Sequence, residues 1–343
     1  MHALDYGKYT SYTQMRTNTA AITVLSCALA LPVGAQSRLA ERIDSVLTAR
    51  EEKAKAKYDT AYIDKPGQKW TVKLRGNVSG TGLYAKGMMD DSRFKGELEA
   101  EMRSTVGATV SYHGLSLGFA INPAKLSGRS KDNEFTLTSY GNRIGADLVY
   151  TSTKTLSGTA ERGGERYDIG AGMVDMKMIQ ANAYYVFSHN HFSFPAAFTQ
   201  SQVQLRSKGS WLLGLSAFAG RIDTEAGMLP GISKARLQTV NVAIGGGYAY
   251  NFVIKRKWLL HLSAIPHVVV FSRNKLTVED TQQRTPYRFP SLINVGRFAV
   301  VRNFKHDFIG LSAVINLWHH GDSDEMMLES LKWRARLFYG FRF

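Results

Sequence analysis

The sequence is almost free of cysteine, because Cys27 is the only one among 343 residues. One thiol cannot pair within its own chain, which excludes a disulfide-stapled scaffold. After residue 35 the chain also lacks any uninterrupted apolar run of about 18 residues, the length that marks a transmembrane helix. The mean hydropathy of −0.20 is too polar for a helical membrane protein. A membrane β-barrel stays open, because its alternating strands average to nearly neutral hydropathy.

The N-terminal region has the pattern of a secretory signal peptide. A short basic region precedes an apolar run at residues 20–32, and small residues follow at 33–35. We therefore predict that residues 1–35 comprise an upstream extension and a signal peptide that is cleaved before Gln36. Cys27 raises the alternative of a lipoprotein, but the apolar run continues past it.

Residues 37–57 are the one stretch with a helical pattern. Leu39, Ile43 and Leu47 fall on one face, and most of the other positions are charged or polar. After Pro66 the period of the apolar residues changes from about 3.6 to about 2. We predict a periplasmic N-terminal helical segment at residues 36–66 and strands from residue 67 to residue 343.

The last residues of the chain show the strand pattern most clearly, with one apolar face and one mostly basic face. The apolar face comprises Trp333, Ala335, Leu337, Tyr339, Phe341 and Phe343, and the other face comprises Arg334, Arg336, Phe338, Gly340 and Arg342. A terminal Phe on such a strand resembles the signal by which the barrel-assembly machinery recognises outer-membrane barrels. We therefore predict that Tyr339, Phe341 and Phe343 form an assembly signal.

The same alternation recurs along the chain, separated by tight turns such as residues 255–257 and by long polar stretches such as residues 274–290. Strand starts are predicted near Lys69, Gly96, Leu115, Phe135, Thr155, Asp175, Gln202, Gln238, Trp258, Ser291, Phe308 and Leu328. An even strand count, with short turns on one side and long loops on the other, is typical of bacterial outer-membrane barrels. We predict an all-β fold, an antiparallel transmembrane β-barrel of about 12 strands.

Several segments from about Tyr58 to the C-terminus carry a family resemblance. They are DTAYI at 59–63, VSYHGLSLG at 110–118, SYGN at 139–142, YYVF at 184–187, FSFPAAF at 192–198 and QLRSKGS at 204–210. With these segments the chain resembles an uncharacterised family of Bacteroidetes outer-membrane proteins, a domain of unknown function. The resemblance implies the location and the architecture, and it brings no activity and no catalytic residues.

Charged residues accumulate on the strand faces that the alternation turns toward the lumen. The basic ones are Lys73, Arg75, Arg103, Lys177, Arg334, Arg336 and Arg342, and Glu97, Glu99 and Glu101 form an acidic ladder opposite them. A barrel of about twelve strands can be filled by its own side chains, whereas wide aqueous channels need about 16 to 18 strands. We therefore favour a salt-bridged interior over a selective pore.

His261 and Ser263 are the pair with the most suggestive catalytic spacing. An outer-membrane phospholipase uses a His and a Ser two apart on one strand face, where the imidazole activates the hydroxyl. Here the alternation of Trp258, Leu260 and Leu262 turns the pair inward, away from lipid, and no orienting third residue is identifiable. We favour structural packing for the pair and predict no catalytic residue.

Two further patterns are weaker. His189, His191, His319 and His320 lie near turns and acidic loop residues, but polar loop side chains usually stay solvated, and we predict no metal and no cofactor. The Gly245-Gly246-Gly247 run is not followed by a helix, so it does not match a phosphate-binding loop. In a strand such glycines favour a sharp bend.

Together these patterns predict a protein in the outer membrane of a Gram-negative bacterium. Its net charge of +15 favours contact with lipopolysaccharide phosphates as well as with outer-membrane lipid, while export and strand-borne charges argue against nucleic acid. The predicted function is a narrow channel for small polar or anionic solutes or a structural envelope component, more in keeping with a non-enzyme. The alternatives are a phospholipase-like hydrolase using His261 and Ser263, and a soluble exported β-sandwich.

Overall fold

The computed structural model describes residues 45, 48–49, 57–89, 92–112, 115–126, 132–225, 227, 234–278, 281–283, 291–322 and 326–343. The chain forms two units, Met1–Ala56 and Lys57–Phe343, and nearly everything described belongs to the second. The predicted signal peptide and most of the predicted helix at 37–57 lie outside the described residues. Among the described residues no helix is long and apolar enough to cross a membrane.

The second unit consists almost entirely of strands. The longer ones are β2 (Trp70–Met89), β4 (Arg103–Tyr112), β7 (Ile144–Thr153), β10 (Val174–Val186), β12 (Lys208–Thr224), β13 (Ala235–Ile254), β14 (Trp258–Val278), β16 (Leu292–Asn303), β17 (Asp307–Asp322) and β18 (Met326–Arg342). The shorter elements are β1 (Ile63–Asp64), β3 (Ser92–Glu99), β5 (Leu115–Ile121), α3 (Pro123–Leu126), β6 (Asn133–Tyr140), β8 (Ser157–Arg162), β9 (Glu165–Ile169), α4 (Phe194–Phe198), β11 (Val203–Gln204) and β15 (Thr281–Gln283).

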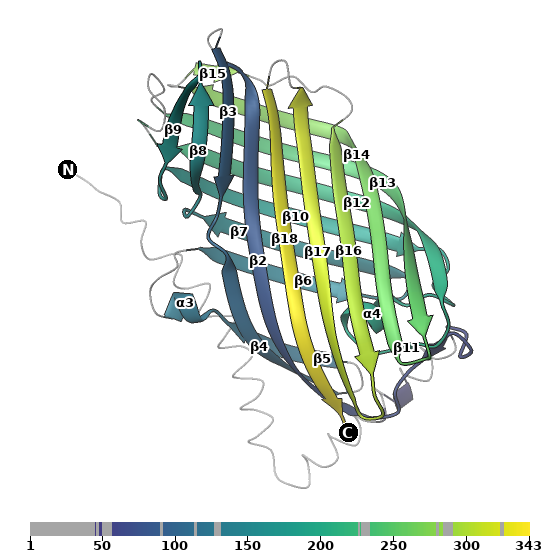
Figure 1. The fold of residues 1–343 in the computed structure, drawn as a ribbon. Coiled ribbons are helices and arrows are strands. Elements are labelled where there is room, and N and C mark those ends of the chain that lie inside the picture. Colours follow the sequence, from purple (N-terminus) through teal and green to yellow (C-terminus); the bar gives the residue numbers. More distant parts are fainter. Residues whose placement is uncertain are drawn as a thin grey trace, which may run out of the picture. The chain divides into compact units, whose positions relative to one another are not determined.

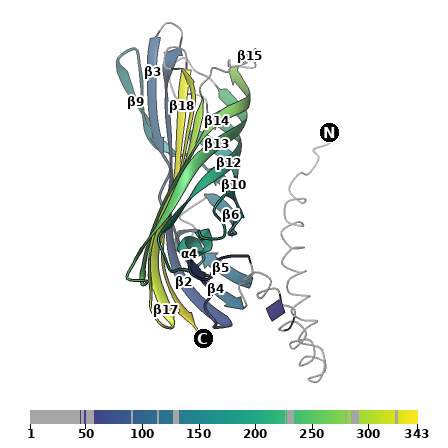
Figure 2. The ribbon, with the colours of Figure 1, turned by 90° about the vertical axis from the view of Figure 1, so that its right-hand side faces the viewer.

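Sixteen of the strands form one antiparallel sheet that curls into a half-barrel. Its main order is β6-β7-β10-β12-β13-β14-β16-β17-β18-β2-β3-β8-β9, and β4 and β5 extend from the other half of β2. The last strand pairs with the first long one, from Arg342 opposite Thr71 to Met326 opposite Gly87. In Figure 1, β2, β18, β17 and β16 run side by side in front of β7, β10 and β12, and Figure 2 shows the curl from the side. The predicted antiparallel all-β architecture is confirmed.

Eleven of the twelve predicted strand starts have a counterpart in this sheet. The start predicted near Gln202 falls at β11, which pairs with β1 in a separate two-stranded sheet, and the following strand of the large sheet, β12, begins at Lys208. The predicted strand near Gly96 is two strands, β3 and β4, because residues 100–102 interrupt it. The whole of β7 was missing from the prediction, and the predicted strand near Thr155 is β8, which makes a side hairpin with β9. The short β15 pairs with the end of β14.

One part of the sheet has no backbone closure. Within the described residues β5 pairs with β4 and β6 pairs with β7, but no ladder joins β5 to β6. The edge of β6 is therefore held by contacts other than a backbone ladder, and those contacts come from side chains in the interior.

The two faces of the sheet are inverted relative to a water-soluble protein. Large apolar side chains on the convex face are exposed, for example Trp211 at 68%, Leu74 at 60% and Leu337 at 60%. Polar and charged side chains are buried on the concave face, for example Arg297 at 3% and Asn241 at 0%. A sandwich would show the opposite distribution, because apolar surface normally leaves water on folding.

The glycine run on β13 includes two positions where the backbone of β14 comes close. The register of the two strands shifts between Val242 and Ala243, just before the run. A Cβ on Gly247 would overlap the carbonyl oxygen of Ala264, and a Cβ on Gly245 would overlap that of Pro266. A Cβ on Gly246 would have only the carbonyl oxygen of Leu212 nearby, at 3.9 Å. Close backbone approach is thus the reason for glycine at positions 245 and 247.

Gly247→Ala should destabilise the sheet, because its methyl group meets main chain rather than a movable side-chain end. We expect a loss of about 1 to 3 kcal/mol, the range typical of overpacking. The measurement is the midpoint of thermal unfolding. Gly246→Ala is the matched control and should change the midpoint little, so equal losses in the two variants would contradict the close approach.

Candidate functional site

The concave side of the sheet holds a short buried segment, residues 192–204, which we call the plug. It contains α4 and β11, and all five residues of α4 are buried. Ser193 caps α4 by accepting a hydrogen bond from the backbone N–H of Ala196 at 3.1 Å, and Pro195 occupies the first turn, where its missing N–H is not needed. In Figure 2, α4 lies between β6 and the strands at the opposite side of the curl, consistent with its contacts to β6, β14 and β16.

Two of the predicted inward basic residues hold the end of the plug. Lys73 on β2 donates to the Gln200 side-chain oxygen at 3.1 Å and to the Thr199 carbonyl at 3.3 Å. Arg342 on β18 donates to the Gln200 carbonyl at 3.0 Å. Both cations therefore bond to neutral oxygens of the plug.

His261 and Ser263 form a hydrogen-bonded chain with a third residue, Asn251. The distance from His261 Nε2 to Ser263 Oγ is 3.1 Å, and the distance from His261 Nδ1 to Asn251 Oδ1 is 2.7 Å. The amide nitrogen of Asn251 donates to the Ser193 carbonyl and to Gln204 Oε1, so its oxygen is the atom that faces the histidine. This arrangement places the proton of His261 on Nδ1 and leaves Nε2 able to accept the Ser263 hydroxyl proton.

The sequence carries a signal that places Asn251 beside His261. The turn at residues 255–257 pairs Ile254 with Trp258, and counting along the hairpin places Asn251 opposite His261. The plug then encloses the pair: the rings of Phe194 and Phe198 have centroids 5.0 Å from that of His261. His261 is fully buried and Ser263 is 8% exposed, so the Ser263 hydroxyl is closed off from lipid and bulk water.

A second network crosses the interior further along the sheet. Arg297 on β16 donates to Asp147 on β7 at 2.9 Å, and both side chains are buried. Asn182 on β10 donates to the other oxygen of Asp147 at 2.9 Å and accepts from the Ser216 hydroxyl at 2.8 Å. The guanidinium of Arg297 also lies 5.1 Å from the ring centre of Tyr184. This network joins strands on opposite sides of the curled sheet.

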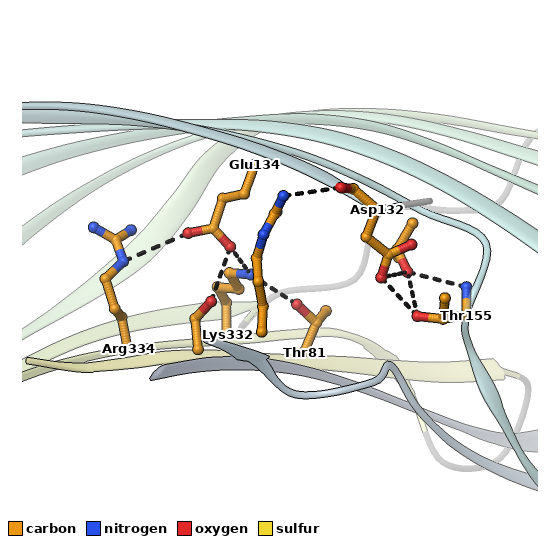
Figure 3. A network of polar contacts seen from close by, with 9 residues as sticks. Thr81, Asp132, Glu134, Thr155, Lys332 and Arg334 are labelled. Atoms are coloured by element: carbon orange, nitrogen blue, oxygen red, sulfur yellow. Dashed lines mark hydrogen bonds and ion pairs between the residues drawn. The ribbon is translucent and has the colours of Figure 1, made fainter. Parts of the chain in front are cut away.

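A third network, drawn in Figure 3, holds the open edge of β6 against β18 and β2. Lys332 on β18 forms an ion pair with Glu134 on β6 at 2.6 Å and donates to Thr81 on β2 at 3.0 Å. Arg334 approaches the other Glu134 oxygen at 3.6 Å. Nearby, Arg103 donates to the Asp132 carbonyl at 2.9 Å. Side chains thus connect β6 to the strands that its backbone does not reach.

The remaining predicted lumen charges are of two kinds. Arg75 and Arg336 face inward, whereas Glu97, Glu99, Glu101 and Lys177 are exposed. Arg336 donates to Asn77 at 2.7 Å, and Arg75 is half-buried with no ion-pair partner among the described residues. The basic residues on β2, β4 and β18 therefore do face inward, together with Glu134 and Lys332, which the sequence reasoning had not included.

The acidic ladder and Lys177 are corrections to the predicted lumen. Glu97, Glu99 and Glu101 are exposed, whereas Leu98 is buried in the core. The interruption at residues 100–102 changes the phase of the alternation, so the phase that fits β4 is reversed on β3. Lys177 is also exposed, between buried Met176 and Met178, and its nearest acidic group is Asp175 at 3.8 Å.

The histidines noted in the sequence make local pairs. His191 lies 3.3 Å from Asp59, and His319 lies 2.7 Å from Glu329. No three His, Cys, Asp or Glu side chains within the described ranges are placed to hold a metal ion. The side chains predicted as an assembly signal, Tyr339, Phe341 and Phe343, are exposed on the convex face.

The family model described as "Domain of unknown function (DUF4421)" matches residues 57–343. No curated protein matches the chain. Among solved structures, the outer membrane protease OmpT of Escherichia coli has 5% identity and a TM-score of 0.43, covering 81% of this chain and 97% of that one. The translocator domain of the autotransporter NalP of Neisseria meningitidis has 8% identity and a TM-score of 0.30, with coverage of 90% and 98%. The Pseudomonas putida toluene transporter TodX has 7% identity and a TM-score of 0.26, with coverage of 80% and 90%.

Arg297→Met should be strongly destabilising, because it leaves the Asp147 carboxylate buried without its cation. We expect a loss of about 3 to 5 kcal/mol in the free energy of unfolding. The double variant Asp147→Asn with Arg297→Met should recover much of that loss, measured as a double-mutant cycle. Lys177→Met, which removes an exposed cation, should cost no more than about 1 kcal/mol. An Arg297 variant as stable as the Lys177 variant would contradict this role.

Proposed function

The chain belongs to the DUF4421 family, a domain of unknown function, and on that premise we propose that it is an outer-membrane β-barrel protein whose interior is closed by its own plug. Its role is that of a non-enzymatic component of a Gram-negative envelope, with a closed lumen rather than a standing pore. Because the family description assigns no activity, the proposal depends on the geometry of this chain.

The observation that carries the proposal is the exposed apolar band on the convex face. On β13 this face presents Val240, Ile244, Tyr248 and Phe252, all more than 40% exposed. Twelve residues of strand, at about 3.3 Å each and a tilt of about 45°, span about 28 Å. That height matches the apolar band of about 25 Å that outer-membrane barrels present to lipid. A water-soluble protein rarely exposes a continuous apolar surface of this size.

The connections support one orientation of the barrel. The turn from β13 to β14 is Lys255–Lys257, and the turn from β16 to β17 comprises residues 304–306. At the other end, the connections from β12 to β13 and from β14 to β16 are longer, and the one from β17 to β18 is short, at residues 323–325. The connection from β10 to β12 lies at the turn end and is long because it contains the plug. Short turns belong on the periplasmic side and long loops on the outer side in such barrels. In this orientation Tyr339, Phe341 and Phe343 lie at the periplasmic end, where the proposed assembly signal would be read.

The filled interior supports a closed state. The plug and the networks of Arg297 and Glu134 occupy the concave side. A cavity lined by Gln180, Asn316 and Lys332 has a volume of about 20 Å³, which is room for a single water. The basic residues Arg75 and Arg336 lie near Lys73, which contacts the plug. They favour anions over cations on any path that opens.

The purified protein in planar bilayers should therefore show no steady conductance. Lys73→Gln with Arg342→Gln removes the cationic donors to the plug, and such hydrogen bonds contribute about 1.5 to 3 kcal/mol each. We expect brief anion-selective openings at least about tenfold more often in this variant. Lys177→Gln, an exposed charge change of the same sign, is the control. A large steady conductance of the unmodified protein would overturn the closed state, and recovery from the periplasmic fraction without detergent would overturn the membrane location.

One observation favours a second candidate, a lipid-directed hydrolase. Asn251, His261 and Ser263 are arranged so that His261 can take the Ser263 proton while the Ser263 oxygen attacks an ester carbonyl. Asn251 would then act as a positioning residue that maintains the histidine tautomer. Burial opposes this function, because His261 is fully buried against the rings of Phe194 and Phe198 and Ser263 is only 8% exposed, so an ester has little access to the pair.

A phospholipase assay on mixed micelles separates the two candidates. With the plug in place we expect no turnover of phosphatidylethanolamine, because the Ser263 hydroxyl is enclosed. Turnover that disappears in Ser263→Ala, while the unfolding midpoint stays unchanged, would establish the hydrolase. Turnover that persists in Ser263→Ala would point to a contaminating enzyme.

A further inference from the structure

A groove with a basic lining lies on the convex face of the sheet, and the three interior networks do not include it. We call it the rim groove. It has a volume of about 590 Å³ and is lined by side chains from β7, β10, β12, β13 and β14. Its polar lining includes Lys177, Arg221, Gln238, Arg273 and Lys275.

The strand register places these side chains in one row across neighbouring strands. Lys177 lies opposite Arg221, and Arg221 lies opposite Gln238 on the next strand. Gln238 in turn lies opposite Lys275. Arg273 is two residues before Lys275, on the same face of β14, and lies opposite Val240. Four strands therefore contribute to one row, although its members are far apart in the sequence.

The charge of the row is only partly neutralised. Asp175 lies near Lys154 and Lys177, at 3.2 and 3.8 Å, and Asp223 pairs with Arg221 and Arg236. Six basic side chains thus stand against two acidic ones, a local excess of four positive charges. Arg273 and Lys275 form no hydrogen bond or ion pair within the described part of the chain. Among these six basic side chains they are the two without an acidic partner in the described ranges.

The rim groove lies directly above the apolar band. Below Lys177 the same face of β10 continues with Ile179, and below Gln238 the same face of β13 continues with Val240. Both apolar side chains are more than 40% exposed and also line the groove. At the end of the sheet with the longer connections, this boundary falls at the headgroups of the outer leaflet.

We propose that the rim groove binds the phosphorylated headgroup of an outer-leaflet lipid. This inference rests on the membrane location proposed above. Arg273 and Lys275 donate to the phosphate oxygens, with Arg221 and Lys177 adding charge, and a guanidinium can bind two phosphate oxygens side by side. The acyl chains extend over Ile179 and Val240. A freely diffusing phosphate would gain the charge contacts but not this apolar contact.

The test is binding of bisphosphorylated lipid A to the full chain in detergent, followed by native mass spectrometry. Arg273→Gln with Lys275→Gln should weaken binding at least about tenfold, because both uncompensated cations are removed. The matched control is Lys255→Gln with Lys257→Gln, the same charge change on the turn at the other end of β13 and β14. It should bind like the unmodified protein.

Two ligand controls identify the source of the phosphate. Lipid A stripped of its phosphates should bind poorly, and excess inorganic phosphate should compete only weakly. The proposal would be overturned if the two double variants bound lipid A equally, or if phosphate-free lipid A bound as well as lipid A. Full competition by inorganic phosphate would also overturn it, because the groove would then be a simple anion site. Fractionation of the same variants tests the membrane location separately: a protein found in the outer membrane that fails to bind lipid A would refute only the groove.

Discussion

A charged side chain that the strand alternation turns inward has to find its partner on another strand, and the interior of this protein depends on that requirement. Arg297 on β16 reaches Asp147 on β7, and Lys332 on β18 reaches Glu134 on β6. Breaking such a buried pair leaves an uncompensated charge that costs several kcal/mol. These pairs therefore determine which strands face each other across the curl. They also hold the edge of β6 in a region where no backbone ladder within the described chain does so.

The plug provides partners for two further inward cations, but these partners are uncharged. Lys73 and Arg342 bond to carbonyl and amide oxygens of residues 199–200 rather than to carboxylates. Neutral acceptors neutralise no charge, so this end of the interior keeps its positive excess. The plug also supplies the Ser193 carbonyl and the Gln204 side chain that orient Asn251. The element that closes the interior is thus the same element that orders the Asn251, His261 and Ser263 chain and covers it.

The convex face has the opposite composition, because apolar side chains are favourable in contact with lipid and unpaired charges are not. The boundary between these two conditions is visible where Ile179 and Val240 give way to Lys177 and Gln238. The basic row that lines the rim groove requires the register of four neighbouring strands to agree, and the pairings of β10, β12, β13 and β14 provide that agreement. The closed interior and the lipid-facing surface therefore both follow from the alternation of polar and apolar side chains along the strands.

Part of this could be read from the sequence alone, and part could not. A period of two is local, so the alternation of Leu337, Tyr339 and Phe341 with Arg334 and Arg336 was sufficient to predict an all-β fold with an apolar outer face. Hairpin counting from residues 255–257 is also sufficient to place Asn251 opposite His261. An interruption in a strand can reverse which residues face inward. Because residues 100–102 interrupt the strand, the pattern of β4 predicts the wrong face for Glu97 and Glu99. Only the tertiary structure could decide that Asp147 meets Arg297 across 150 residues of chain, that the plug packs against His261, and that cations of β10, β12 and β14 line one groove. The first two contacts depend on how far the sheet curls, and the third depends on which strands pair and in what register, so none of them is a local pattern.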